Sequence, residues 1–290
     1  MSRNHLPHLA QKLFNTPLAI TPGKIEIIMA ALADRFGIAQ ILRVDGSKAR
    51  MMEDDDWDAG TPASMMPSTV VNGVALIQVQ GTLVQKLGTL QPWSGMTGYD
   101  GIRANFNAAL ADPSVRAIVF DIDSNGGEVS GCFDLVDFIY AARGRKPIRA
   151  ILGESAYSAA FAIASACDHI SVPRTGGTGS VGVICAHVDF SRALDAAGIT
   201  VELIQYGAFK ADGNEYTPLT KAARARMQAD VNTMGDLFVE TTARNLNLSP
   251  ADVKATQAAT YMGAAGAAVG FAHAVMAPDE AFRSLLAELG

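Results

Sequence analysis

From residue 73 onward, the sequence alternates apolar segments of strand length with segments of helical spacing. The apolar segments are almost continuous, as is typical of strands buried on both faces of a sheet. Such strands, separated by helices, indicate a largely parallel sheet covered by helices. We therefore predict an α/β fold with strands over residues 74–79, 115–122, 148–152, 169–172, 181–188 and 200–205, and helices over 99–110, 130–142, 156–167, 189–197 and 220–246.

The sequence before residue 73 has a different character. One amphipathic helix, for packing or assembly, is expected at about 23–36. An acidic run, Glu53 to Asp56, lies among many turn-forming residues and predicts a flexible linker. The predicted organisation is an N-terminal helical segment (1–43), an acidic linker (44–72), the main domain (73–277) and a C-terminal helix (278–290).

Composition and charge exclude several classes of function. The net charge of −6 argues against a general nucleic-acid-binding protein. Three scattered cysteines, Cys132, Cys167 and Cys185, fit neither a disulfide framework nor a zinc cluster and are expected to be reduced core residues. The five histidines lack ligand-like spacing, so no metal or cofactor is expected. Without a cleavable leader or a membrane-length apolar run, the predicted location is cytoplasmic.

A serine near the start of a small-residue helix is the first candidate for chemistry. Ser158 follows the apolar strand 148–152 and opens the segment AYSAAFAIAS. A serine in the first turn of a helix lies near unpaired backbone N–H groups, which can hold an oxyanion. Taken alone, the segment is better explained as a helix that packs closely against a sheet. Its sequence also departs from the G-x-S-x-G nucleophile elbow.

A glycine pair directly after the strand 115–122 is the second candidate. Gly126 and Gly127 let the backbone approach a ligand and turn its N–H groups toward it. They can supply one oxyanion donor, with the amide of Ala159 as the other. An ordinary strand-to-helix turn is the alternative. The later match to G-x-G-x-x-G at 177–182 leads into a β-branched run and not a helix, so we do not interpret it as a dinucleotide site.

A lysine in a mostly uncharged loop is the third candidate. Lys210 follows the predicted strand 200–205 and stands beside Phe209. To act as a general base it must be neutral, which requires its pKa to fall by roughly 3 units from about 10.4. The alternative is a solvated surface lysine. His169 and His187, the other possible bases, are interpreted as structural.

Six ordered segments resemble the signal peptide peptidase A family of serine peptidases, most closely its phage branch of minor capsid protein C-like head maturation proteases. They are GTLVQKLG, SGMTGYDGI, DPSVRAIVFDIDSNGGEVSG, AYSAAFAIAS, VPRTGGTGSVGV and KADGNEYTPLT. The resemblance extends from about Val74 to Val275. It implies a ClpP/crotonase-like spiral of β-β-α units with helices packed on a largely parallel sheet.

The resemblance also implies roles for individual residues. Ser158 matches the nucleophile, Lys210 the general base, and Ser180 a serine that orients the lysine. The oxyanion hole is matched by Gly127, beside Gly126, and by the amide of Ala159.

Two differences from the family accompany these matches. Asn125 replaces the proline that commonly precedes the glycine pair. The sequence ends at Gly290, whereas phage proteins of this type often carry a C-terminal scaffold-like extension. Half-size relatives form rings in which the serine and lysine of one site can come from neighbouring subunits. We therefore expect a homo-oligomer.

The function predicted from the resemblance is a serine endopeptidase with a Ser-Lys dyad. Its expected partners are polypeptides of the phage head: capsid, portal or scaffold proteins. A bacterial signal peptide peptidase that degrades leader peptides is one alternative, and an inactive scaffold that retains the fold is another. A crotonase-type acyl-CoA enzyme would share the fold but would not need Ser158 and Lys210.

Overall fold

A mixed sheet forms the centre of the molecule. The computed structural model describes residues 15–25, 28, 69–87 and 95–290. In the eight-stranded sheet the order is β12-β10-β8-β6-β3-β2, with β9 beside β8 and β13 beside β9. The neighbours β3, β6, β8 and β9 run parallel. The strands are β2 (Thr69–Val71), β3 (Val74–Gln80), β6 (Ala117–Ser124), β8 (Ile148–Ala156), β9 (His169–Val172), β10 (Gly177–Gly179), β12 (Thr260–Met262) and β13 (Ala274–Val275).

A second, five-stranded sheet has the order β11-β1-β7-β4-β5. Its strands are short: β1 (Pro17–Ile20), β4 (Thr82–Val84), β5 (Met96–Gly98), β7 (Gly126–Glu128) and β11 (Ile184–Cys185). The two sheets are built by a repeat in which a long strand enters the large sheet, a short strand enters the small one, and a helix follows. The repeat occurs as β3, β4 and α3 (Tyr99–Ala111), and again as β6, β7 and α4 (Cys132–Tyr140). The predicted α/β fold of β-β-α units is confirmed.

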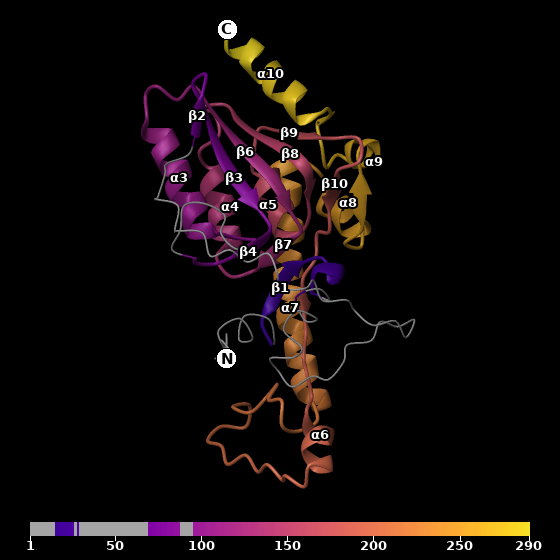
Figure 1. Ribbon diagram of the computed structural model, residues 1–290. Coiled ribbons are helices and arrows are strands. Elements are labelled where there is room, and N and C mark those ends of the chain that lie inside the picture. The colour runs from indigo at the N-terminus through magenta and orange to yellow at the C-terminus, as the bar shows by residue number, and fades with distance from the viewer. Residues whose placement is uncertain (1–14, 26–27, 29–68, 88–94) are drawn as a thin grey trace, which may run out of the picture.

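The two faces of the large sheet are covered by different helices. Along β6, Ile118 and Phe120 belong to the main core under α3, α4 and α5 (Ala159–Ser165), where Phe120 stacks on Phe106 at 5.6 Å between ring centroids. The alternate residue Val119 belongs to a smaller cluster with Leu285 of α10 (Pro278–Leu289). This alternation follows from the two-residue period of a strand. Figure 1 shows α3, α4 and α5 together beside the sheet and α10 separate from them.

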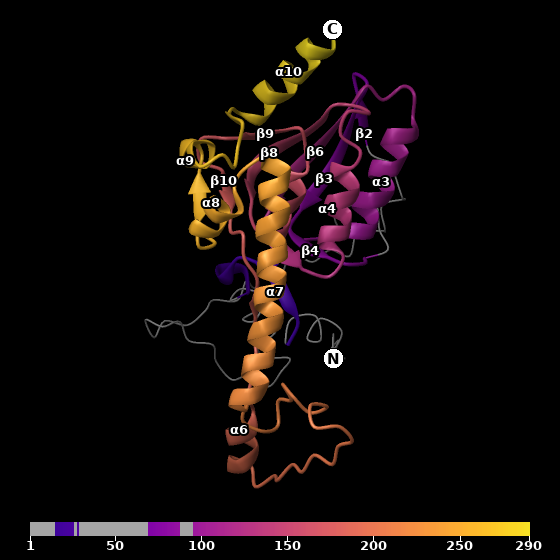
Figure 2. The ribbon, with the colours of Figure 1, turned by 180° about the vertical axis from the view of Figure 1, so that it is seen from behind.

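A long helix carries part of the chain away from the sheets. Helix α7 (Lys221–Leu246) begins beside α6 (Ser191–Ala196), far from both sheets, and runs back past them (Figures 1 and 2). We call α6, residues 197–220 and the first half of α7 the arm, and the two sheets with their covering helices the body. The C-terminal half of α7 is anchored in the body, where Phe238 is fully buried against Phe133. Helices α8 (Pro250–Ala255) and α9 (Ala264–Ala268) follow.

Most elements predicted from the sequence are present. The helix predicted over 220–246 is α7, whose first turn is capped by the Thr220 hydroxyl, which accepts from the Ala223 N–H at 3.0 Å. The strand predicted over 169–172 is β9. Residues 22–25 are helical and overlap the start of the helix predicted at about 23–36. Most of that range and most of the linker 44–72 lie outside the described residues. Residues 69–71, assigned to that linker, form β2.

Two predicted strands are wrong, and the sequence analysis assigned no strand to any of the short strands β1, β2, β4, β5, β7, β10, β12 and β13. Of residues 181–188, only Ile184–Cys185 forms a strand, because the preceding residues lie against α7 and pair with no described strand. Residues 200–205 lie in the arm, where no described strand offers an edge, and Ile204 is 96% exposed. The sequence analysis assigned no strand to Pro17–Ile20, which forms β1.

Candidate active site

Ser158 lies where β8 ends and α5 begins. It is the N-cap residue of α5 and has φ 55° and ψ −121°, a left-handed conformation that is costly for a residue with a Cβ. Its side chain is fully buried. Its N–H donates to the Gly179 carbonyl at 2.8 Å, and its hydroxyl lies 3.5 Å from the Gly182 carbonyl. Backbone strain of this kind is found at functional sites, where surrounding contacts hold it in place.

The glycine pair faces Ser158 and the start of α5. A Cβ added to Gly126, which has φ 94°, would lie 3.0 Å from the Ala159 nitrogen and 3.0 Å from the Ser158 Cβ. A Cβ on Gly127 would lie 1.8 Å from the Leu83 carbonyl oxygen of β4. Both positions therefore exclude a side chain. As the first residue of α5, Ala159 has an N–H with no acceptor inside the helix.

The turn before the glycine pair is fixed by the Ser124 hydroxyl. This hydroxyl donates to the Gly81 carbonyl at 2.6 Å and accepts from the Gly126 N–H at 3.1 Å. The peptide N–H of Gly126 thus points toward the side chain of Ser124, the last residue of β6. Asn125, at the position of the family's proline, accepts from the Thr21 N–H at 3.1 Å through its carbonyl.

Ser180 is next to the segment that holds the Ser158 backbone. It follows Gly179, whose carbonyl accepts from the Ser158 N–H, and it has a positive φ of 57°. The Ser180 N–H donates to the Ala259 carbonyl at 2.9 Å, and the residue is 8% exposed. The structure therefore gathers Ser158, Ser180, Ala159 and the glycine pair in one place.

Lys210, the predicted general base, is not grouped with the other predicted site residues within one chain. It is exposed in the arm, within residues 197–220. The neighbouring Asp212 pairs with Arg226 near the start of α7, and the Arg226 guanidinium lies 4.0 Å from the Phe209 ring centroid. Figures 1 and 2 show this segment at the end of α7 that is remote from the sheets.

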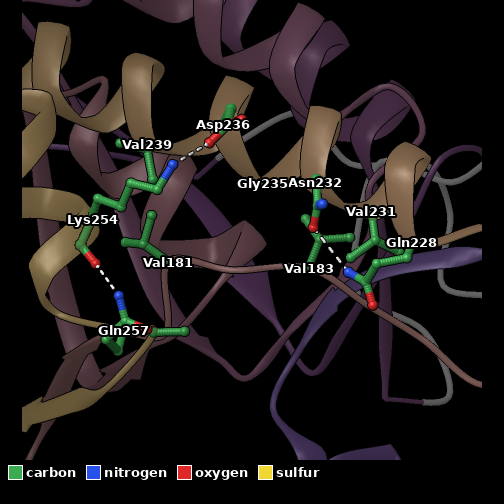
Figure 3. A pocket seen from close by; sticks show the side chains of 11 residues that line it. Val181, Val183, Gln228, Val231, Asn232, Gly235, Asp236, Val239, Lys254 and Gln257 are labelled. Atoms are coloured by element: carbon green, nitrogen blue, oxygen red, sulfur yellow. Dashed lines mark hydrogen bonds and ion pairs between the residues drawn. The ribbon is translucent and has the colours of Figure 1, made fainter. Parts of the chain in front are cut away.

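A cavity of about 500 Å³ lies beside the segment that contacts Ser158. Val181 and Val183, on either side of Gly182, form one wall, and α7 forms the other (Figure 3). Lys254, Gln257 and Ala258 also line the cavity, and Lys254 forms an ion pair of 3.0 Å with Asp236 of α7. The cavity could not be predicted from the sequence, because its walls come from segments about 50 residues apart that carry no shared motif.

Cys132 and Cys167 are buried, and the histidines considered as bases contact other side chains of the protein. Burial raises the pKa of the Cys132 thiol to about 12 and that of Cys167 well above its usual value. His169, the first residue of β9, and His273, the residue before β13, stack at 5.0 Å between ring centroids. His187 contacts the Asn15 side chain at 2.9 Å. In the part of the chain that the structure describes, no group of three or more His, Cys, Asp or Glu side chains is suited to a metal ion.

The sequence of the chain matches a known peptidase family over half of its length. The model of peptidase family S49 matches residues 141–290. The chain belongs to this family. It is 37% identical to "Head-tail preconnector protein GP5" of Enterobacteria phage P21 over 96% of this chain, and 36% identical to "Capsid assembly protease C" of Escherichia phage lambda over 89%. These two matches span 57% and 60% of the relatives' lengths, so the chain corresponds to somewhat more than half of each.

More distant similarities were also found. "Protease 4" of Haemophilus influenzae is 24% identical over 74% of this chain and 35% of its own length. Among solved structures, an enoyl-CoA hydratase/isomerase family member has a TM-score of 0.44 over 77% of this chain and 74% of its own. A membrane-bound stomatin-specific protease has a TM-score of 0.45 over 75% and 80%, and both structures are 16% identical to this chain. None of the described helices combines the length and apolar character needed to cross a membrane.

Proposed function

We propose that this chain is a serine endopeptidase that cleaves polypeptides of the phage head, with Ser158 as its nucleophile. The observation that carries the proposal is the strained N-cap conformation of Ser158 beside Gly126 and beside the N–H of Ala159, the first residue of α5. A serine peptidase needs a nucleophile next to N–H donors that point at the oxyanion formed from the substrate's scissile carbonyl. Membership of peptidase family S49 supports the same class of reaction.

The reaction proceeds through an acyl-enzyme. The Ser158 oxygen attacks the substrate carbonyl carbon as neutral Lys210 takes the hydroxyl proton. The N–H groups of Gly127 and Ala159 hold the oxyanion. When the peptide C–N bond breaks, the lysine gives its proton to the departing amine. Water then hydrolyses the ester, and Ser180 orients the lysine throughout.

The general base comes from a second copy of the chain. Lys210 belongs to the arm, and the arm extends away from the sheets and from α5, whose N-cap is Ser158 (Figure 1). The arm also exposes large apolar side chains to solvent, with Ile204 96%, Tyr206 100% and Phe209 64% exposed. Exposed apolar clusters of this kind mark contact surfaces between proteins. Packing the arm on a neighbouring body would cover them and deliver Lys210 to the partner's serine.

The substrates are scaffold, capsid or portal polypeptides. The two phage relatives bear the names of a capsid assembly protease and a head-tail preconnector, and both align with almost all of this chain. The site of action is the host cytoplasm or the procapsid. The reaction as written needs no metal or cofactor.

Hydrolysis of casein, an unfolded protein, tests the nucleophile. The wild-type chain is compared with Ser158→Ala and with Ser114→Ala, which removes an exposed serine hydroxyl that bonds to Asp112. We expect Ser158→Ala to abolish hydrolysis and Ser114→Ala to retain it. Equal activity in all three chains would overturn the assignment, and a wild type that is inactive as an assembled oligomer would favour a scaffold that has kept the fold.

A further inference from the structure

Strand β1 fills a slot one strand wide in the small sheet. It pairs antiparallel with β7 through Leu18, Ala19 and Ile20, and antiparallel with β11 through Pro17 and Leu18. Within the described residues, no other strand lies between β7 and β11. Removing β1 would therefore leave two facing strand edges with unpaired N–H and C=O groups. Such a slot binds an extended peptide through its main chain.

The slot lies against the candidate active site. Its β7 edge is the glycine pair, with Ala19 in register with Gly127 and Ile20 with Gly126. The Ala19 carbonyl oxygen lies 2.2 Å from the position that a Cβ on Gly126 would occupy. The Ala159 nitrogen and the Ser158 Cβ each lie 3.0 Å from that same position. One carbonyl of β1 is thus next to both the nucleophile and the donors.

The side chains of β1 are enclosed. Leu18, Ala19 and Ile20 are 4%, 0% and 5% exposed, and Ala19 belongs to the main core. Ser158 is itself fully buried while β1 is in place. A second polypeptide therefore has no access to the Ser158 hydroxyl along this edge.

We propose that residues 17–20 are an intramolecular pseudosubstrate, which occupies the position of a substrate strand and must leave before a polypeptide can bind. The Ala19 carbonyl marks the position of the scissile carbonyl. Because Ala19 is completely enclosed, the site selects a small side chain at that position, flanked by apolar residues like Leu18 and Ile20. The assignment of a scissile carbonyl rests on the proposed peptidase function. The binding of an extended strand in the slot does not.

A single substitution can lock β1 in place. Cys185 of β11 is a free thiol in register with Pro17. Residues paired in an antiparallel ladder have Cα atoms about 4.5–5.5 Å apart, within the span of about 4.4–6.8 Å that a disulfide bridges. Pro17→Cys therefore allows a disulfide across the two strands. Cys132 and Cys167 are fully buried and do not compete for it.

The first measurement is casein hydrolysis by the Pro17→Cys chain, oxidised and then reduced. We expect the oxidised chain to be at least tenfold slower and the reductant to restore its rate. The control combines Pro17→Cys with Cys185→Ser and is expected to be insensitive to the reductant. Equal rates with and without the disulfide, once peptide mass analysis has confirmed the crosslink, would overturn the proposal.

The second measurement does not depend on catalysis. In chains that carry Ser158→Ala, binding of a fluorescein-labelled peptide with the sequence of residues 15–22 is followed by anisotropy. Adding Leu18→Asp, which places a charge in a buried position of β1, is expected to tighten binding at least tenfold. The oxidised Pro17→Cys chain should bind nothing, whereas its reduced form should bind. A melting curve checks that Leu18→Asp leaves the body folded. If this substitution unfolds the body, the comparison of the oxidised and reduced Pro17→Cys chains still tests the proposal.

The two measurements separate the two proposals. Equal peptide affinity in the locked and unlocked chains overturns the pseudosubstrate, whatever happens to casein. Peptide binding that follows the state of β1, without casein hydrolysis by any chain, supports the pseudosubstrate and overturns the peptidase.

Discussion

The body and the arm differ in how far their apolar side chains are buried within one chain. In the body, all seven residues of α5 behind Ser158 are buried, and the strained serine is held by backbone contacts on both sides. In the arm, Ile204 and Tyr206 are almost fully exposed. The body therefore holds the proposed nucleophile and donors together, whereas the arm presents apolar surface that the described residues leave exposed. If the arm supplies Lys210 to another copy as proposed, folding of one chain and completion of the site are separate events.

The largest expected effect comes from separating the two halves of the site. Ser158→Ala and Lys210→Ala should each lower casein hydrolysis by at least about 10³-fold, since groups that act as one unit are lost together. If the halves come from different copies, an equimolar mixture should recover about a quarter of the sites, because each needs one intact serine and one intact lysine. Absence of recovery, with subunit exchange shown by native mass spectrometry, would place both halves in one chain.

Next in size is the effect of a side chain at the glycine pair. Gly127→Ala brings a Cβ to 1.8 Å from the Leu83 carbonyl, so the backbone must move and the oxyanion donor moves with it. We expect kcat/KM to fall about 10²–10³-fold, the effect of losing one such donor. Gly235→Ala on α7 meets nothing within 4 Å and serves as the control. Unchanged kcat/KM in Gly127→Ala would exclude this glycine from the oxyanion hole.

The arm should respond in assembly while the fold of the body is unaffected. Replacing Tyr206 and Phe209 by serine removes exposed apolar surface and the contact of Phe209 with Arg226. Since buried aromatic side chains carry much of the energy of an interface, the association constant should drop about 10- to 100-fold by analytical ultracentrifugation. The melting temperature at low protein concentration should barely change. An unaltered association constant would show that copies do not meet through the arm.

A smaller effect, on stability alone, is expected where α5 and α7 are joined. The Arg143 guanidinium donates to the carbonyls of Ser165 and Ala166 at the end of α5, at 2.8 and 2.9 Å, and to that of Asn245 in α7 at 3.1 Å. Arg143→Ala should lower the free energy of unfolding by about 2–3 kcal/mol, measured with urea. Arg145→Ala, on the same loop but exposed, is the control. Equal losses from both substitutions would contradict this role.

The smallest effect is a pH dependence from the stacked histidines of the body. Burial lowers the pKa of His169 from 6.5 to about 4, aided by the charge of Arg149, and lowers that of His273 too. The His273 Nδ1 accepts from the Ile170 N–H at 3.0 Å, which requires the neutral ring.

Since the unfolded chain binds more protons in this range, stability is complete above pH 6.5 and declines as the pH falls toward 4. The melting temperature should decrease between pH 7 and pH 5, and less steeply in His169→Gln. A wild type and a variant with parallel curves would show that His169 does not contribute.

The parts of the fold that the sequence predicted have local causes. The β-β-α order follows from apolar runs and helical spacing, and α7 begins after Thr220 because its hydroxyl caps the first turn. By contrast, β1 is four residues long, with partners more than 100 positions away, so no periodicity could reveal it. Residues 200–205 alternate like a strand but have no sheet edge to join, because they lie in the arm.

The candidate site divides in the same way. The grouping of Ser158 with Ala159 follows from adjacency, and its nearness to Gly126 follows from two neighbouring strands, β6 and β8, that end at one edge of a sheet. The role of Lys210 stays a prediction, because the arm that carries this exposed lysine lies far from the sheets that hold Ser158. The cavity beside Gly182 and the occupied slot depend on long-range packing and could not be predicted from sequence motifs.

The position of β1 also determines when during protein synthesis it can be seated. Asn15, just before β1, contacts His187 across 172 positions, and the slot lacks one wall until Ile184–Cys185 has been made. At about 5–20 residues per second, the ribosome therefore releases the N-terminal strand many seconds before that wall emerges. Each newly made chain thus passes through a period in which its first strand is free and its glycine edge uncovered. The masked form is reached only after translation has passed the last strand of the slot.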